Sequence, residues 1–215
     1  MPKISKDEML EVAAINETKL DFDNIFKGEK GHADLFVAYH CDTIKLVSET
    51  EGYYFSQDFN MWVERSKSNF VLFISAFLDD HICNIIKDIS KDKDKANKYF
   101  ELTKIHKAVR NVKHCENVFK FAAPQLLDKT FKQKLNKVPH YLPISKGRLI
   151  DLKTLEIRLR TKDDLFDFEL PYDFNPKKIS KAKKFFGQIM KNDEEIVDYL
   201  QTMLGYCITG ETDLR

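Results

Sequence analysis

The sequence predicts an α+β fold in which small β-hairpins flank a helical middle and the C-terminus is helical. Two observations lead to this class. Apolar residues recur at helical spacing, three and four positions apart, through residues 68–135 and again near the C-terminus. On either side of this middle, residues 43–65 and 139–160 contain short alternating stretches separated by turn residues, which is typical of strands. The order β, α, β, α without an internal repeat therefore indicates a mixed domain.

The N-terminal third begins with a mixed segment and continues into a small hairpin. Residues 1–30 are interpreted as an extension, and residues 31–215 as the domain itself. Residues 32–40, HADLFVAYH, predict a short helix. Residues 43–48 predict a strand, ETEG a turn with Gly52 at its flexible position, and YYFSQD the return strand. FNMWVER continues the extended chain, and its Trp62 is expected to pack the hairpin onto helices.

The helical middle is predicted as three segments. The clearest is 68–89, with Ser68 as its N-cap and a core stripe formed by Phe70, Phe73, Ile74, Phe77, Leu78, Ile82, Ile85, Ile86 and Ile89. A charged turn separates it from a second helix near 95–112, whose stripe is Tyr99, Leu102, Ile105, Val109 and Val112. A third segment, at about 115–135, contains Pro124, which is expected to break or restart the helix.

The last part of the chain predicts strands and then two helices. After a DLKT turn, apolar and polar residues alternate through Leu155, Glu156, Ile157, Arg158, Leu159 and Arg160. Asn175 is expected to cap a helix that has Pro176 at its first position and runs to about residue 191. The last helix is expected to start at Asp193, with Glu194 and Glu195 in its first turn, and to reach a glycine at Gly205.

Composition excludes several classes of protein. The 215 residues carry a net charge of +1, so no global attraction to nucleic acid is expected and any basic surface must be local. Seventeen phenylalanines promise a well-filled core. The opening MPKISKDEML is too polar for a signal peptide. No apolar run approaches the roughly 20 residues that span a bilayer, so we expect an intracellular protein without a membrane segment.

The sequence contains no recognisable catalytic or phosphate-binding motif. GxxxxGK[ST], GxGxxG, HExxH and GxSxG are all absent. The acid pairs Asp79–Asp80, Asp163–Asp164 and Glu194–Glu195 are interpreted as solvated helix faces, turns or first turns, so no catalytic residue is assigned. The cysteines lie far apart, at Cys41, Cys83, Cys115 and Cys207. Histidines stand near three of them, at His40, His81 and His114, yet no pair has the short spacing of structural zinc sites, and no metal is expected.

Basic residues form local clusters that could follow a phosphate backbone. They lie at Lys87, Lys91, Lys93, Lys95, Lys98, Lys104, Lys107, Arg110 and Lys113, at Lys129, Lys132, Lys134 and Lys137, and at Lys177, Lys178, Lys181, Lys183 and Lys184. Surface lysines often serve only for solubility. The best candidates for nucleic-acid binding are Lys104, Lys107 and Arg110, because a spacing of three places them along one helix face.

Several weak motifs in the same order give the chain a family resemblance. They are GHADLFVAYHCDTIKLVSETEGYYFSQDFNMWVE, YLPISKGRLIDLKTLEIR, ELPYDFNP and the closing YLQTMLGYCITGET, of which LGYCITGE is the most specific. Over about residues 31–215 the chain resembles the helicase-associated N-terminal domain of viral superfamily III helicase-primases. These are the poxvirus-type and giant-virus replication ATPases and their phage and plasmid primase relatives.

The resemblance implies an accessory role rather than catalysis. In that family the ATPase motor follows the domain, and any primase module would precede it, so the family's catalytic residues have no counterparts here. The full-length protein would be an ATP-dependent DNA helicase using ATP and Mg²⁺. The domain would need no cofactor and would aid homo-hexamer assembly, guide DNA to the motor, or both, at viral replication sites in the host-cell cytoplasm. The alternatives are a protein-interaction scaffold without DNA contact and a stand-alone enzyme with an unrecognised site.

Overall fold

The computed structural model describes residues 23–89, 96–175 and 179–209 and confirms the mixed fold class. Helices occupy the middle and the C-terminus, and the strands form two three-stranded sheets. The chain divides into two compact units. The first comprises Met1–Tyr53 and Glu64–Phe131, and the second comprises Tyr54–Val63 and Lys132–Arg215. Residues 1–22, most of the expected N-terminal extension, lie outside the described residues.

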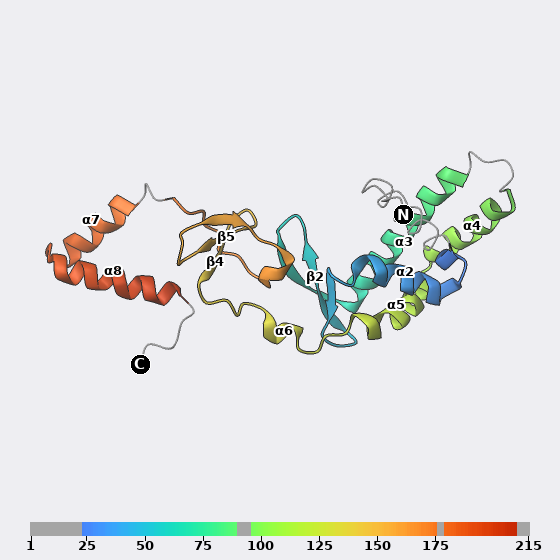
Figure 1. The fold of residues 1–215 in the computed structure, drawn as a ribbon, viewed down its shortest axis with the longest axis horizontal. Coiled ribbons are helices and arrows are strands. Elements are labelled where there is room, and N and C mark those ends of the chain that lie inside the picture. The colour runs from blue at the N-terminus through green and yellow to red at the C-terminus, as the bar shows by residue number, and fades with distance from the viewer. Residues whose placement is uncertain (1–22, 90–95, 176–178, 210–215) are drawn as a thin grey trace, which may run out of the picture. The chain divides into compact units, whose positions relative to one another are not determined.

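Helices dominate the described part of the first unit (Figure 1). They are α2 (Gly28–His40), α3 (Lys67–Ile89), α4 (Ala96–Val109) and α5 (Val112–Leu126). Helix α5 packs against both α2 and α3, and α3 packs in turn against α4. The side chains between these helices are fully or almost fully buried, and they include Leu35, Phe36, Ile74, Leu78, Ile82, Leu102, Val109 and Val118. The helical spacing in the sequence therefore identifies the core elements correctly.

The helix boundaries and the buried face of α3 differ from the sequence expectation. The helix begins at Lys67, so Ser68 lies within its first turn instead of capping it. Phe73, expected in the core stripe, is 41% exposed. The stripe of phenylalanines and isoleucines is wider than the surface that α4 and α5 cover, which leaves its edge in contact with solvent. Long α3 would by length and composition alone be able to cross a bilayer, but it packs here as the core helix of its unit.

The helical segment expected at about 115–135 does stop and restart, but the break follows Leu126 and is not at Pro124 itself. The proline lies inside the helix, and the helix ends at Leu126, two residues later. Close to a C-terminus the missing N–H costs a single helical hydrogen bond, so the last turn can still form. A separate short helix, α6 (Phe131–Lys134), follows.

The first sheet has the strand order β1–β2–β3 and consists of β1 (Ile44–Leu46), β2 (Glu51–Ser56) and β3 (Met61–Ser66). The sequence predicts Gly52 in the turn, but the structure places it within β2. A β-carbon at this position would stand 2.5 Å from Leu46 Cδ2 and 2.8 Å from the Lys45 carbonyl oxygen. The glycine is needed because β1 approaches closely, and conformational freedom in a turn plays no part.

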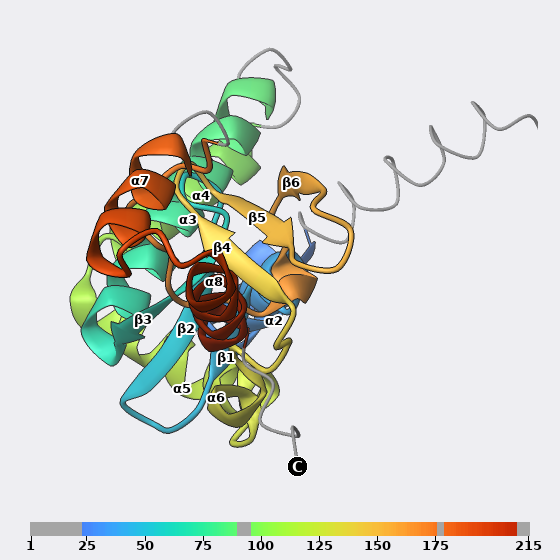
Figure 2. The same cartoon turned by 90° about the vertical axis from the view of Figure 1, so that its left-hand side faces the viewer.

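The second unit contains the antiparallel sheet β4–β5–β6 (Figure 2). Its strands are β4 (Tyr141–Ile144), β5 (Arg148–Asp151) and β6 (Ile157–Leu159), with Leu142 opposite Ile150 and Leu149 opposite Arg158. Apolar and polar residues alternate in β6, but all three strand residues are exposed. Ile157 and Leu159 are exposed, whereas Arg160 just beyond the strand is buried.

Trp62 is a core residue of the second unit, as its aromatic character indicates. It is buried, and its indole N–H donates to the carbonyl of Lys162 at 2.8 Å. Its backbone N–H donates to the carbonyl of Phe166, also at 2.8 Å. These two partners lie in the 3₁₀ turn η2 (Lys162–Asp164) and in the loop after it.

The C-terminal helices are α7 (Ile179–Ile189) and α8 (Glu194–Ile208), which pack against each other. The expected start of α8 is confirmed, because Glu194 and Glu195 occupy its first turn. Asp193 is its N-cap, and the Asp193 carboxylate accepts from the Ile196 N–H at 3.2 Å. Gly205 lies inside α8 and does not end it. The expected start of α7 at Pro176 lies outside the described residues. Helix α8 carries exposed apolar side chains, at Ile196, Tyr199, Met203, Leu204 and Ile208.

Candidate functional site

The three basic residues proposed for nucleic-acid binding lie on or next to α4. Lys104 and Lys107 are exposed residues of the helix. Arg110 is also exposed but follows the last helical residue, Val109, so only the two lysines share the helix face that the spacing predicts. The structure therefore places the three side chains close together along the chain and at the surface.

Two of the three cations already have a partner in the first unit. Arg110 Nε donates to Asp79 Oδ1 at 2.7 Å, which ties the end of α4 to α3. Lys104 Nζ lies 4.5 Å from the centre of the Phe100 ring, in a cation–π geometry on the same helix. The Arg110 guanidinium lowers the pKa of the Asp79 carboxyl, and a hydrogen bond from His106 lowers it further. Asp79 is thus the acid that balances charge on this surface.

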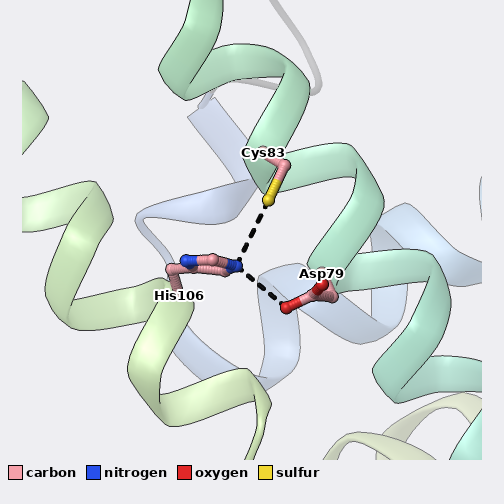
Figure 3. A group of neighbouring side chains, drawn as sticks. All are labelled: Asp79, Cys83 and His106. Carbon is pink, nitrogen blue, oxygen red and sulfur yellow. Dashed lines mark hydrogen bonds and ion pairs between the residues drawn. The ribbon is translucent and has the colours of Figure 1, made fainter.

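Asp79 belongs to a small cluster that links α3 to α4 (Figure 3). His106 Nε2 lies 2.8 Å from Asp79 Oδ1 and 3.3 Å from Cys83 Sγ. Asp79 and Cys83 stand one helical turn apart on α3, so both side chains face His106 on α4. All three residues are half-buried, and their potential ligand atoms lie within 4.8 Å of one another. The arrangement brings an imidazole, a carboxylate and a thiol to one point.

Sequence reasoning missed this cluster because its members are far apart in the chain. Cys83 was considered beside His81, two positions away, whereas its structural partner is His106, 23 positions away. Asp79 was interpreted as part of a solvated acid pair. The one local signal was the four-residue spacing of Asp79 and Cys83, which places them on the same face of a helix. Only the packing of α3 against α4 supplies the third residue.

A second polar cluster lies between α2 and α5, and in it only His32 is fully buried. His32 Nδ1 lies 2.9 Å from His114 Nε2, and His32 Nε2 lies 2.9 Å from the Ile25 carbonyl oxygen. His114 also faces Glu29, at 3.6 Å, and Asn117 donates to the same carboxylate at 3.0 Å. Burial is the main cause that lowers the pKa of His32 to about 4, and burial also lowers the pKa of His114.

The remaining acids singled out in the sequence have structural partners or are exposed. Asp164 pairs with Arg158 at 2.5 Å and accepts from the backbone N–H of Thr161 at 2.7 Å, as in a capping box. Glu194 and Glu195 are exposed in the first turn of α8. Of these acids, Asp164 thus forms an internal ion pair, and Glu194 and Glu195 form a helix start.

The comparisons with known proteins concern most of the chain. The family described as D5 N terminal like matches residues 33–202. No curated protein matches the chain significantly. The matched range contains the strands β1 to β6 and the helices α3 to α7. It therefore includes the α3–α4 surface described above. Because the match covers well over half of the chain, the protein belongs to the D5 N terminal like family, the N-terminal domain of D5-type viral helicase-primases.

Proposed function

We propose that this chain is a non-catalytic accessory domain of a viral DNA replication helicase-primase, and that it contacts DNA through the exposed end of α4. The observation that carries the proposal is the family match over residues 33–202. The ATPase chemistry, with ATP and Mg²⁺, would belong to a motor outside the 215 residues. The other subunits of a homo-hexamer would be its protein partners. The protein would act at viral replication sites in the host cytoplasm.

The charge of the α4 surface supports contact with a phosphate backbone. Lys104 and Lys107 extend from α4 into solvent, and Lys98 and Lys113 are exposed on the neighbouring turns. Contacts between such side chains and phosphates are independent of base sequence. Because each contact releases condensed counterions, binding should weaken steeply as salt increases. A few contacts give micromolar or weaker affinity, which a ring of subunits would multiply through effective concentration.

A second role, in subunit assembly, is favoured by exposed apolar side chains in the second unit. Helix α8 exposes Tyr199 by 63% and Ile208 by 53%, and the edge strand β6 exposes Leu159 by 60%. Large apolar side chains exposed on a helix or an edge strand can mark protein contacts, and α8 and β6 are two separate candidates for such a surface. If this surface is the main functional feature, the domain acts as a protein-interaction scaffold, with or without DNA.

The test of DNA contact is fluorescence anisotropy with labelled single-stranded DNA at two salt concentrations. The double variant Lys104→Glu and Lys107→Glu should abolish binding at low salt. Arg110 is tested separately as Arg110→Gln, because a glutamate there would repel Asp79 and disturb the α3–α4 contact. Wild-type binding should fall by at least about tenfold between low and physiological salt if several phosphates are neutralised.

A matched control keeps the same change in net charge. Lys120 and Lys153 are exposed lysines outside the basic clusters, one in each unit, and their double replacement by glutamate should leave most of the binding intact. Equal loss in both double variants would mean that net charge, and not the α4 surface, governs binding. Absence of wild-type binding at low salt would reject the DNA role and leave assembly, which light scattering of wild type and of Tyr199→Lys then tests.

A further inference from the structure

The cluster of Asp79, Cys83 and His106 has the chemistry and the spacing of a metal site. A single nitrogen, His106 Nε2, faces both a carboxylate oxygen and a sulfur, at 2.8 Å and 3.3 Å (Figure 3). Carboxylate, thiolate and imidazole are the three ligand types that proteins use for zinc. They reach this point from two helices, so the site depends on the packing of α3 against α4.

The distances are close to those that a tetrahedral ion requires. Zinc bond lengths of about 2.0 Å to nitrogen and oxygen and about 2.3 Å to sulfur place nitrogen about 3.3 Å from oxygen and about 3.6 Å from sulfur. The observed separations in the cluster are 2.8 Å and 3.3 Å. The nitrogen–oxygen and nitrogen–sulfur separations would each have to widen by about half an ångström or less to admit the ion. Cys83 would bind as the thiolate and release its proton to solvent.

We propose that Asp79, Cys83 and His106 bind a thiophilic divalent cation such as Zn²⁺, leaving a fourth position for water. The thiol and the imidazole select zinc-like ions over Mg²⁺ and Ca²⁺, which prefer oxygen ligands. All three residues are half-buried, so an ion can enter from solvent while the helices shield it. The bound ion would cross-link α3 to α4 and stabilise the first unit, independently of any DNA contact.

Arg110 competes with the ion for the same atom. Its Nε donates to Asp79 Oδ1, which is also the oxygen closest to His106. Both the guanidinium and the ion carry positive charge, so the ion must displace Arg110 from this oxygen or share the carboxylate with it. Removing the guanidinium while keeping a polar side chain should therefore strengthen ion binding. This expectation separates a metal site from a purely structural hydrogen-bonded cluster.

The experiment titrates the metal-free, fully reduced 215-residue chain with Co²⁺ and then with Zn²⁺. A thiolate–cobalt charge-transfer band should rise to one equivalent and disappear as Zn²⁺ replaces Co²⁺. Cys83→Ser should lose the band, and His106→Gln should bind the ion much more weakly. Arg110→Gln should bind it more tightly than wild type. Cys41→Ser, which changes an exposed cysteine outside the cluster, should behave as wild type.

A second measurement distinguishes the loss of metal binding from the misfolding of a variant. Circular dichroism confirms the fold of each variant, and the melting temperature is then measured with and without Zn²⁺. An ion that binds the folded state raises the melting temperature of wild type but not of Cys83→Ser. The proposal is overturned if folded wild type shows no thiolate–cobalt band, if the band survives in Cys83→Ser, or if zinc stabilises both proteins equally.

Discussion

Two arginines of the second unit show how strongly a residue's role depends on its surroundings. The side chain of Arg158 is 44% exposed and pairs with Asp164, whereas the side chain of Arg160 is completely buried. The Arg160 guanidinium donates to the carbonyls of Phe168 and Phe59, at 3.1 Å and 2.9 Å, and to Glu169 at 2.5 Å. It thereby ties the hairpin tip to the loop after η2 within the second unit.

Arg160→Ala should be one of the most destabilising substitutions in this unit. It removes three hydrogen-bond partners at once and leaves two carbonyls and a carboxylate without their donor, a loss of about 3–5 kcal/mol for a broken buried ion pair. Urea unfolding, followed by Trp62 fluorescence, measures the effect. The control is Lys153→Ala at an exposed position, expected within about 0.5 kcal/mol of wild type. Equal stability of the two variants would show that Arg160 is dispensable.

His32 should make the stability of the first unit depend on pH. Its pKa falls to about 4 in the folded protein, mainly because the ring is buried, so the unfolded chain binds the proton more readily. The contribution of neutral, buried His32 to the free energy of unfolding is therefore complete above the unfolded pKa of about 6.5, and it is lost as pH falls from there toward 4. Glu29 raises the pKa of His32 and so opposes the effect of burial, whereas His114 lowers this pKa further. We expect the free energy of unfolding to fall by about 3 kcal/mol across this pH range.

The measurement is the free energy of unfolding in urea at several pH values between about 7.5 and 4.5. His32→Gln should flatten the decline, although its stability at neutral pH is lower because a buried hydrogen-bonded ring is lost. His140→Gln, in the second unit, is the matched control and should keep the decline. A decline of the same size in wild type and in His32→Gln would assign it to other groups.

At the scale of elements, two glycines lie within regular secondary structure, and their surroundings leave very different amounts of space for a side chain. Gly52 lies in β2, where an added β-carbon would meet Leu46 and the backbone of Lys45. Gly205 lies in α8, where an added β-carbon would have no neighbour within 4 Å. The first glycine is required by the close approach of β1, whereas the second only weakens a helix.

Alanine substitutions should separate these two roles. Gly52→Ala should destabilise the protein by about 1–3 kcal/mol, because the backbone of Lys45 must move to admit the methyl group. Gly205→Ala should stabilise α8 by up to about 1 kcal/mol, the difference in helix propensity between the two residues. Thermal unfolding by circular dichroism measures both changes. Shifts of the same sign would contradict this assignment.

For the whole chain, the proposed accessory role predicts that the 215 residues do not hydrolyse nucleotides. The sequence has no phosphate-binding loop, and of its acid pairs Asp164 forms an ion pair, Glu194 and Glu195 start α8, and Asp79 joins the α3–α4 cluster. The purified chain should show no ATP or GTP turnover above that of a preparation from cells lacking it. Turnover that co-purifies with the chain through two columns would instead support a stand-alone enzyme.

The sequence by itself determined the fold class, most elements and the family. Helical spacing located α3, α4 and α5, and the Asp193 cap with its two following glutamates located the start of α8, because these signals are local. The family resemblance rests on the same linear order of motifs and is confirmed by the match over residues 33–202. The assignment of Lys104, Lys107 and Arg110 to DNA stays a prediction.

The tertiary structure decided the properties that depend on which faces meet. Periodicity in α3 includes Phe73 in the apolar stripe, but only the position of the neighbouring helices leaves this ring 41% exposed. Alternation through residues 157–160 suggests a buried Leu159 and an exposed Arg160, whereas Leu159 is 60% exposed and Arg160 is buried by its contacts with Phe59, Phe168 and Glu169. The meeting of Cys83 with His106 joins positions 23 residues apart, which no short-range pattern encodes. Long-range contacts of this kind arise only when two helices bury a common surface, and that is why the candidate metal site emerges from the fold and not from the sequence.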